Sequence, residues 1–276
     1  MTELIPDEHH YKGSFSGRVY PLWADAKASI SNLRPEFLAF LAKRYGLPVT
    51  PEDGIAYIAG VMAHPAFTAR FQKDLVQPGL RLPLTAEAAL FTEAVALGLE
   101  VIWLHSYGER FIDAGAGRPK GPPRMAKDIE PTIPGPGEIP LSPEPLPDTM
   151  TYDPATRRLG IGKGYVENVS PAMWAYEISG KKVIWQWFSY RKRDRTKPII
   201  GDRRPPSPLE KIQPDGWLSE YTTDLLNLLR VLGRVIALEP AQADVLERIC
   251  AGGLIPLEDL QQAGLIATAE TPVKAE

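Results

Sequence analysis

The amino-acid sequence predicts an α+β fold, in which an N-terminal helical unit is followed by a small, mostly antiparallel sheet region and by C-terminal helices. Between residues 35 and 108, apolar side chains recur at the three-to-four spacing of amphipathic helices. Short alternating segments bounded by turn residues occupy residues 150–166, which is typical of antiparallel strands. Residues 219–235 are apolar around much of a helix circumference, which indicates a buried helix.

The helical unit begins after an irregular arm at residues 1–34. Its first expected helix starts at Pro35 and ends at Gly46, because glycine readily takes the left-handed conformation that closes a helix. Thr50 and Pro51 then supply the N-cap and the first position of a second helix, with acidic residues in its first turn. The apolar face of that helix consists of Ile55, Ile58, Ala59 and Met62.

Two further helices complete this unit. A short one opens at Pro65 and extends to about Leu75. After a turn at residues 78–79, Thr85 is expected to cap a long helix that runs to about Gly108. The composition of these helices is that of a scaffold.

The middle of the chain changes character twice. Residues 112–148 hold a dense run of prolines and glycines, which predicts a connector lying over the surface rather than a regular element. Residues 150–166 are expected to form a hairpin followed by a third strand. Residues 169–178 are expected to enter the same sheet, and residues 183–190 favour a helix over a strand.

The C-terminal part is expected to hold a buried helix at residues 219–235 and a last helix from Ala241 to Cys250, opened by Pro240. A loose tail follows Ala267. The expected organisation is an arm and helical unit, a connector, a region of sheet, basic loop and helices, and a tail, at residues 1–111, 112–148, 149–267 and 268–276. One integrated domain at residues 8–255 is the alternative.

Bulk properties exclude several classes of protein. The hydrophobic share of 44% and the charged share of 24% are ordinary for a globular protein, which argues against disorder. Cys250 is the only cysteine, so no disulfide framework and no cysteine-based metal site is expected. The N-terminus lacks the pattern of a signal peptide, and no apolar run approaches the roughly 18 residues needed to span a bilayer. We therefore expect a cytoplasmic protein without a membrane partner.

No motif in the sequence assembles a catalytic site. His64 and His105 lie near expected helix ends, where packing or capping is the favoured role, and metal-binding spacings are missing. The glycines at 160, 162 and 164 are not followed by the helix and acidic residue of a dinucleotide site, and therefore predict turns. We also find no Walker A sequence and no amino-methyltransferase tetrad. The expectation is no catalytic residue, no metal and no cofactor.

Positive charge is concentrated in one segment. Residues 157–204 carry twelve Lys and Arg against four Asp and Glu, a net +8, whereas the whole chain carries −3 and the remainder therefore −11. Such segregation is the electrostatic footprint of a site for a polyanion. The alternative from charge alone is a solvated basic hairpin without a partner. The candidate DNA-binding residues are Arg191, Lys192, Arg193, Arg195, Lys197, Arg203 and Arg204.

Arginine predominates in this set, which suits bidentate contacts to phosphate or to the O6/N7 edge of guanine. We expect Arg191, Arg193 and Arg195 to be exposed. The aromatic residues just before them are expected to belong to the core rather than to stack on bases, because their neighbours are apolar; they are Trp185, Trp187, Phe188 and Tyr190.

Four long segments occur together in order, namely PEDGIAYIAGVMAHPAFTARF, ALFTEAVALGLEVIWLHSYGERF, the stretch from VSPAMWAYEISGKKVIWQWFSYRKRDR to PDGW, and EYTTDLLNLLRVLGRVIALEPAQADVLERI. In order and spacing they resemble the C-terminal specificity domain of Type ISP restriction–modification enzymes, over most of residues 8–255. Residues around Trp174, Tyr176, Gly180 and Trp187 also resemble target-recognition domains of related adenine-specific DNA methyltransferases.

The resemblance implies a target-recognition fold that binds a double-stranded DNA site for an adenine-N6 methyltransferase and restriction endonuclease. The helicase, cofactor-binding and catalytic motifs of that family are missing here, so DNA recognition is what carries over. The alternative is a non-catalytic interaction subunit or degenerate remnant that binds DNA only with a methyltransferase partner. A small stand-alone enzyme is a third hypothesis, which the missing motifs disfavour.

Overall fold

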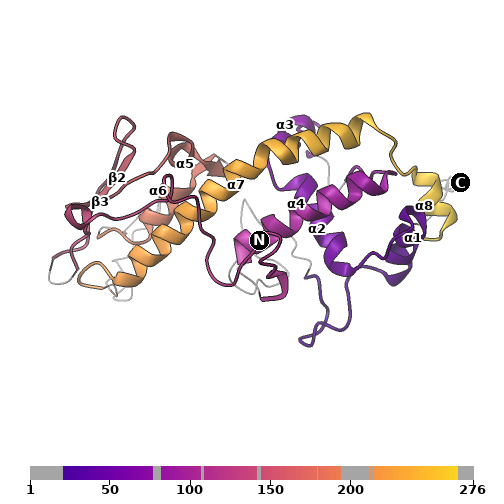
Figure 1. Cartoon of the computed structure of the whole chain (residues 1–276), viewed down its shortest axis with the longest axis horizontal. Coiled ribbons are helices and arrows are strands. Elements are labelled where there is room, and N and C mark those ends of the chain that lie inside the picture. The colour runs from indigo at the N-terminus through magenta and orange to yellow at the C-terminus, as the bar shows by residue number, and fades with distance from the viewer. Residues whose placement is uncertain are drawn as a thin grey trace, which may run out of the picture. The chain divides into compact units, whose positions relative to one another are not determined.

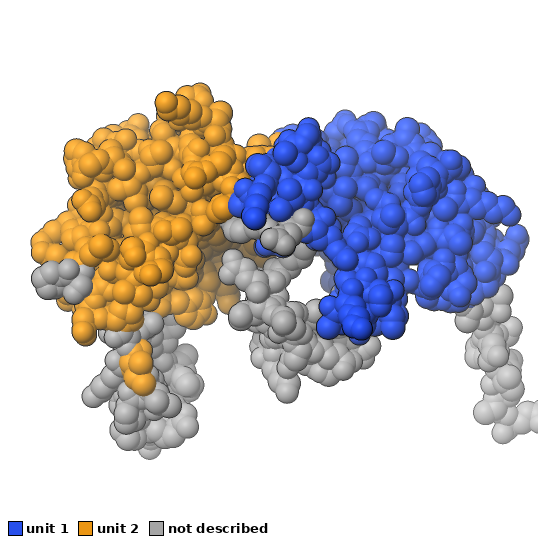
Figure 2. Space-filling model, turned by 60° about the horizontal axis from the view of Figure 1, so that its bottom comes forward, with its two compact units in different colours: residues 1–121, 238–276 blue, residues 122–237 orange. Residues whose placement is uncertain are grey.

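The computed structural model of the chain describes residues 21–76, 82–106, 109–141, 144–178, 180–193, 212 and 214–266. The chain forms two compact units, distinguished by colour in Figure 2. Unit 1 comprises residues 1–121 and 238–276, and unit 2 comprises residues 122–237. These boundaries differ from the expected ones, because part of the proline-rich segment and the C-terminal helices are divided between the units. Each unit has its own hydrophobic core.

Unit 1 is helical, as expected (Figure 1). Gly46 ends the first helix in the left-handed conformation, with φ of 69°. Thr50 and Asp53 form a capping box at the start of the second, in which the Asp53 N–H donates to Thr50 Oγ1 and the Thr50 N–H donates to Asp53 Oδ2. The elements of unit 1 are α1 (Pro35–Tyr45), α2 (Pro51–Met62), α3 (Pro65–Arg70), α4 (Ala88–Ser106), the 3-10 turn η1 (Glu109–Phe111), the end of α7 (Ser219–Ala251) and α8 (Leu257–Gln262).

Helices α2 and α4 approach so closely that glycine is required at their crossing. A Cβ atom on Gly98 would lie 1.7 Å from the Ala56 carbonyl oxygen, and one on Gly60 would lie 2.2 Å from the Ala94 carbonyl oxygen. Both distances are far inside van der Waals contact. The small residues therefore let the two backbones touch, and the larger side chains around them fill the core of unit 1.

A tyrosine pair ties this core to the segment before α4. The Tyr45 hydroxyl donates to the Thr85 carbonyl over 2.6 Å, and the Tyr57 hydroxyl accepts from the Thr85 N–H over 3.1 Å. The Phe91 ring stacks on both tyrosine rings. Burial raises the pKa of Tyr57 to about 12, so its hydroxyl keeps its proton at neutral pH.

Thr85 does not cap α4, contrary to the sequence expectation. Helix α4 begins three residues later, at Ala88. Thr85 is fully buried and forms an isolated antiparallel bridge with Leu254. Its backbone groups are occupied by the two tyrosine hydroxyls, and these tertiary contacts prevail over the local capping signal.

Among the described residues, one helix is long and apolar enough to cross a membrane by length and composition, namely α4. Glu93 and Glu100 interrupt its apolar sequence, which is why no continuous run stood out. Half of its most apolar stretch is buried within the protein, and its Glu93 forms an ion pair with Arg248. Its composition is thus accounted for by its place in the core of unit 1.

Unit 2 contains two small antiparallel sheets, three described helical segments and a 3-10 turn (Figure 1). The first sheet has the order β1-β2-β3, which confirms the expected hairpin and third strand. Gly162, with φ of 56°, forms the tight turn between β2 and β3, as the glycine spacing predicted. The elements are η2 (Gly135–Gly137), β1 (Met150–Asp153), β2 (Arg158–Ile161), β3 (Gly164–Val166), α5 (Pro171–Ala175), β4 (Glu177–Ile178), β5 (Lys181–Lys182), α6 (Val183–Ser189) and the start of α7.

The alternation of the first sheet places one face in the core. Tyr152 pairs with Leu159, which pairs with Val166, and the last two are fully buried. The opposite face carries Thr151 and Tyr165 beside Gly160. This is the inside–outside pattern that the period-two sequence predicts.

Residues 169–178 do not enter this sheet, so that expectation is wrong. Ser170 caps the short helix α5 by accepting from the Met173 N–H over 3.1 Å, and Pro171 occupies the first helical position. Strand β4 then pairs with β5 in a separate two-stranded sheet. The Ser-Pro capping signal therefore outweighs the strand propensity of the residues that follow it.

The proline-rich segment does more than cross the surface. Ile139 and Leu146 belong to the buried core of unit 2, and Thr132 forms an antiparallel bridge with Glu167 beside the sheet. The expectation of a surface connector is therefore wrong for this part of residues 112–148. Periodicity was missing because the segment contributes single side chains to the core from irregular backbone.

Pro240 lies inside helix α7 and does not open a new one, contrary to expectation. A proline within a helix removes one hydrogen bond and typically costs about 3 kcal/mol. Past it, Val245 and Ile249 are buried in the core of unit 1, and the Gln242 amide donates to the Gly60 carbonyl over 3.0 Å. This burial favours continuation of the helix beyond the proline and opposes the cost of the proline. The tail after Ala267 lies outside the described residues.

The α2–α4 crossing gives a stability prediction. Gly98→Ala should lower the free energy of unfolding by about 1–3 kcal/mol or more, because the added methyl group forces the helices apart. This loss should exceed the gain of up to about 1 kcal/mol from replacing glycine by alanine within a helix. Urea and thermal unfolding followed by circular dichroism measure the difference.

The matched control is Gly253→Ala, also in unit 1, where the new Cβ would lie at an ordinary 3.8 Å from the Ala86 Cβ. It should leave the unfolding curve nearly unchanged. If the two variants were equally stable, the close crossing of α2 and α4 would be contradicted.

Candidate nucleic-acid interface

The expected DNA-binding residues begin where helix α6 ends. Arg191, Lys192 and Arg193 follow the helix directly and are described by the structure. The other four candidates, Arg195, Lys197, Arg203 and Arg204, lie outside the described residues. The structure therefore describes only the first three residues of the basic segment, 191–193, which we call its root.

Helix α6 is positioned by its apolar face. Ile184 and Phe188, one turn apart, are fully buried in the core of unit 2. Trp187 packs edge-on against the buried Trp217 at 6.1 Å between ring centroids. The core expectation is thus confirmed for Trp187 and Phe188. It is wrong for Trp185 and Tyr190, which are 48% and 61% exposed.

Arg191 is held against the body of unit 2 and is not an exposed loop residue. Its guanidinium carbon lies 4.2 Å from the centroid of the Trp187 ring and 5.4 Å from that of Tyr221. It donates to the Trp187 carbonyl over 3.1 Å and lies 3.4 Å from Asp224 Oδ2. Its side chain is only 24% exposed. The expectation of an exposed Arg191 is wrong, because the flat guanidinium lies over the ring of Trp187, four residues earlier, and close to the ring of Tyr221 in α7.

Arg193 is tied down at a second point. Its Nε donates to Asp148 Oδ2 over 2.8 Å, and its backbone N–H donates to the Pro147 carbonyl over 3.0 Å. The hydrogen bond and charge of Asp148 raise the pKa of Arg193. Its side chain remains 54% exposed, as expected, but its charge is partly neutralised. Arg191 and Arg193 together clamp the root of the basic segment to α7 and to the residues before β1.

A hollow of about 360 Å³ lies beside this clamp, within unit 2. Its apolar wall includes Ile139 and Leu146. Two of its cations are already paired with carboxylates, Arg193 with Asp148 and Lys163 with Glu144. Because both side chains already have a carboxylate partner, neither Arg193 nor Lys163 is an unpaired cation for an anionic ligand in the hollow.

The exposed cations closest in sequence to α6 are Lys181 and Lys182, on strand β5. Antiparallel pairing places Lys181 opposite Ile178, which is 60% exposed, and Lys182 opposite Glu177. The Lys182 ammonium lies 5.6 Å from the Trp174 ring centroid. Sequence reasoning counted both lysines in the local charge but not among the site residues. The sequence signal that could have singled them out is that they directly precede Val183, the first residue of α6.

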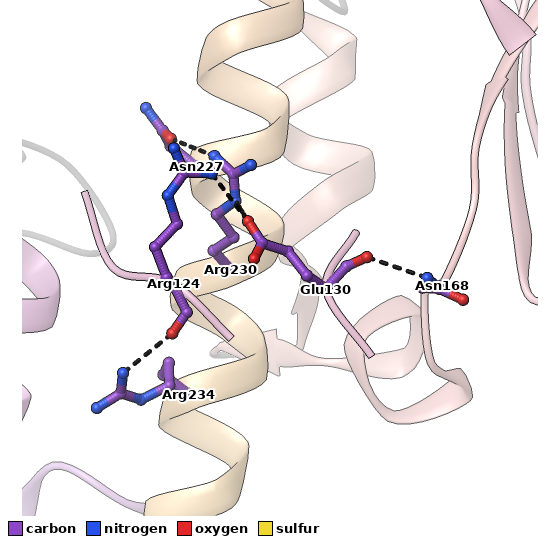
Figure 3. Close-up of polar contacts among 6 residues, drawn as sticks. All are labelled: Arg124, Glu130, Asn168, Asn227, Arg230 and Arg234. Carbon is purple, nitrogen blue, oxygen red and sulfur yellow. Dashed lines mark hydrogen bonds and ion pairs between the residues drawn. The ribbon is translucent and has the colours of Figure 1, made fainter. Parts of the chain in front are cut away.

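A second polar cluster holds the irregular backbone of unit 2 against α7 (Figure 3). Glu130 accepts from Arg124 over 2.9 Å and pairs with Arg230 at 2.7 Å. The Asn168 amide donates to the Glu130 carbonyl, and Arg234 donates to the Arg124 carbonyl. Burial of Glu130 opposes its ionisation, but the two arginines outweigh that effect and lower its pKa. The cations of this cluster are thus engaged in scaffolding.

The described part of the chain shows no convergent acid–base or metal-binding group. None of its His, Cys, Asp and Glu residues form a cluster of three or more that could hold a metal ion. His64 and His105 each contact a backbone carbonyl of their own chain segment, at 2.9 and 2.8 Å. Burial lowers the pKa of both, so each ring is neutral at physiological pH.

Residues 1–227 match the family described as the Type ISP C-terminal specificity domain. The chain belongs to this family. The match includes the α6 helix, the clamp and the whole basic segment, and it confirms the resemblance seen in the sequence.

One solved structure that the chain resembles is the cryo-EM structure of a DrdV–DNA complex, at 16% sequence identity and a TM-score of 0.48. The likeness covers 91% of this chain and 21% of that one, so this specificity domain spans about a fifth of the matched chain. No curated protein matches the chain.

The clamp gives a second stability prediction. Arg191→Ala should lower the free energy of unfolding by about 1–2 kcal/mol, because the stacking on Trp187 and the carbonyl hydrogen bond are lost. Asp224→Asn should have a smaller effect, roughly 0.5 kcal/mol or less, since Asp224 is 54% exposed and solvent screens the ion pair. Chemical denaturation followed by tryptophan fluorescence checks both.

Lys127→Ala, at another exposed cation of unit 2, serves as the control and should be neutral. An Arg191→Ala protein as stable as this control would show that Arg191 does not hold the root of the basic segment.

Proposed function

We propose that this chain binds double-stranded DNA and recognises the target site of a Type ISP-like restriction–modification system that methylates adenine at N6. The match of residues 1–227 to the specificity-domain family carries the proposal. The methyltransferase and nuclease chemistry belongs to other parts of such a system, and this chain has no complete catalytic site of its own. Because its ligand is chromosomal or invading DNA, we place it in the cytoplasm.

The charge distribution supports this function. Residues 157–204 carry +8 and the rest of the chain −11, so a polyanion is attracted to one segment and repelled elsewhere. Such a pattern orients the protein on DNA as well as binding it. A solvated hairpin without a ligand would not need the clamp at Arg191 and Arg193, which restrains the place where the basic segment emerges.

The clamp divides the candidate cations into two groups. Arg191 and Arg193 are engaged with Asp224 and Asp148, and we assign them to positioning the segment. The DNA contacts are assigned to the cations beyond the clamp, in the major groove and on the backbone. These are Lys192, Arg195, Lys197, Arg203 and Arg204. The arginines among them suit bidentate contacts to guanine as well as to phosphate.

The neutralised arginines also favour a second candidate function. With Arg191 and Arg193 paired internally, fewer cations are available to bind DNA without help. In this alternative the chain is a non-catalytic interaction subunit that binds DNA only together with a methyltransferase or restriction polypeptide. A DNA-binding assay with and without such a polypeptide separates the two functions. Binding by the chain alone supports the first, and binding only in the presence of the polypeptide supports the second.

The salt dependence of binding tests the assignment. A variant with Arg195, Lys197, Arg203 and Arg204 all changed to Gln should bind duplex DNA at least tenfold more weakly than the unaltered chain. Its slope of log affinity against log salt should become shallower by roughly 3 to 4, because each phosphate contact contributes about 0.9. Fluorescence anisotropy with labelled duplexes, selected from a random pool, gives both quantities.

A charge-matched control changes four exposed cations of unit 1 to Gln, namely Lys27, Lys43, Arg70 and Lys73. This control should keep most of the affinity and the original slope. Equal losses in the two variants would mean that only net charge matters, and an unaffected first variant would remove the basic segment from the site.

A further inference from the structure

We infer that Arg157, in the turn between strands β1 and β2, binds a phosphate of the DNA backbone. The inference rests on the proposed function and adds to it a contact outside the basic segment at residues 191–204. A contact of this kind positions the duplex on unit 2 without reading its bases.

The backbone of Arg157 is left-handed, a conformation that disfavours most side chains. Its φ is 53°, and among the described residues other than glycine only Ala28 and Asn168 also have a positive φ. Asparagine tolerates this region, and the Asn168 amide in addition donates to the Glu130 carbonyl over 3.1 Å. Arginine has no such local preference, whereas glycine takes the conformation without strain. The backbone of this turn therefore favours glycine over arginine.

The turn itself is fixed by other groups. The Asp153 carboxylate accepts from the Ala155 N–H over 3.0 Å and from the Thr156 hydroxyl over 2.6 Å. The Arg157 carbonyl accepts from the Val169 N–H over 3.0 Å, which ties the turn to the residues after β3. None of these hydrogen bonds uses the Arg157 guanidinium, so the side chain is not what holds the turn.

The other arginines of unit 2 that the structure describes are all engaged within the protein. Arg234 donates to a backbone carbonyl. The remaining five pair with carboxylates, namely Arg124, Arg158, Arg191, Arg193 and Arg230. Arg157 is exposed, and its side chain forms no hydrogen bond or ion pair with another described residue. Its guanidinium donors are therefore available for a ligand.

The acidic residues around this turn do not neutralise Arg157. In the stretch 150–182, Asp153 binds its own turn, Glu167 pairs at 2.6 Å with the arginine that follows Arg157, and Glu177 lies opposite a lysine of β5. Five Lys and Arg against these three acids leave the stretch with a net charge of +2, without any contribution from the basic segment.

A packed aromatic pair supports the turn. Tyr152 stacks on Trp174 with ring centroids 5.1 Å apart, and its hydroxyl donates to the Val169 carbonyl over 2.9 Å. Burial raises the pKa of Tyr152, and the positive charge of Arg157 acts in the opposite direction, which places that charge near the tyrosine. The backbone that carries Arg157 is thus fixed before DNA arrives, and this reduces the entropy lost on binding.

Phosphate is the ligand that suits an exposed and unpaired guanidinium. The planar fork of arginine donates two parallel hydrogen bonds to a phosphate or a carboxylate group. A carboxylate of a protein partner offers similar acceptors. We assign the phosphate because the proposed ligand of this domain is DNA, which carries anionic groups along its entire length.

Arg157→Gly should have opposite effects on stability and on binding. Its midpoint of urea unfolding should equal or exceed that of the unaltered chain, because glycine takes the left-handed conformation freely. Its affinity for duplex DNA should fall roughly fivefold to tenfold in about 0.1 M salt, and the slope of log affinity against log salt should become shallower by about 0.9, the share of one phosphate contact. Fluorescence anisotropy should show the same loss for selected and for random duplexes.

Three variants serve as controls. Ala28→Gly is matched in backbone, because Ala28 has the same φ of 53° and lies in unit 1; it should be as stable as the unaltered chain or more so, with unchanged DNA binding. Lys127→Gln removes one exposed cation elsewhere in unit 2 and should keep the original slope. Arg157→Lys retains the charge and should also keep the slope, with a smaller loss of affinity than Arg157→Gly.

The outcomes separate this inference from the proposed function. If the unaltered chain binds duplex DNA and Arg157→Gly binds with the same affinity and slope, Arg157 is not a DNA contact while the proposed function stands. A lower unfolding midpoint for Arg157→Gly would show that the side chain stabilises the fold and would equally overturn the inference. Loss of binding to a methyltransferase polypeptide alone, with DNA affinity retained, would assign Arg157 to a protein partner instead. Failure of the unaltered chain to bind any duplex, alone or with that polypeptide, contradicts the proposed function itself.

Discussion

The stacking of the Arg191 guanidinium on Trp187 is the contact on which the candidate site depends. It joins three features that are separate in the sequence: the aromatic run of α6, the start of the basic segment and the first turns of α7. A charged loop that left the protein at an undefined place would lose entropy when it met DNA. Because Arg191, the first residue of the basic segment, is held against the Trp187 ring, the starting point of that segment is fixed before any ligand is present.

Counting cations in the sequence overstates how many of them are unpaired. Seven cations between residues 191 and 204 appeared equivalent when counted by charge, but the two described arginines are paired with Asp148 and Asp224. Asp148 lies 45 positions before its partner Arg193, and Asp224 lies 33 positions after its partner Arg191, so no local sequence pattern predicts either pairing. Conversely, Trp185 was assigned to the core by its apolar neighbours, and only the helical phase set by Ile184 and Phe188 turns it outward.

The elements that local chemistry determines could be predicted from the sequence. Gly46, the Thr50 capping box and the turn at Gly162 behave as their residue types require, and the hairpin at residues 150–166 has the expected pairing. Predictions failed where tertiary contacts override a local signal. Pro240 stays within α7 because residues beyond it are buried, Thr85 serves two tyrosines rather than a helix end, and irregular backbone supplies Ile139 and Leu146 to a core. The family was evident because several long segments kept their order, and that does not depend on any one element.

The central claim is that DNA contacts the basic segment at residues 191–204 of unit 2, whose root is restrained by the contacts of Arg191 and Arg193, while the helical core of unit 1 serves as scaffold. Hydrogen–deuterium exchange of the full chain, with and without a saturating duplex, tests it most directly. The account predicts slower exchange of backbone amides from Arg191 through Arg204 on DNA binding and no change in α2 and α4. Slower exchange confined to unit 1, with residues 191–204 unaffected by bound DNA, would contradict it.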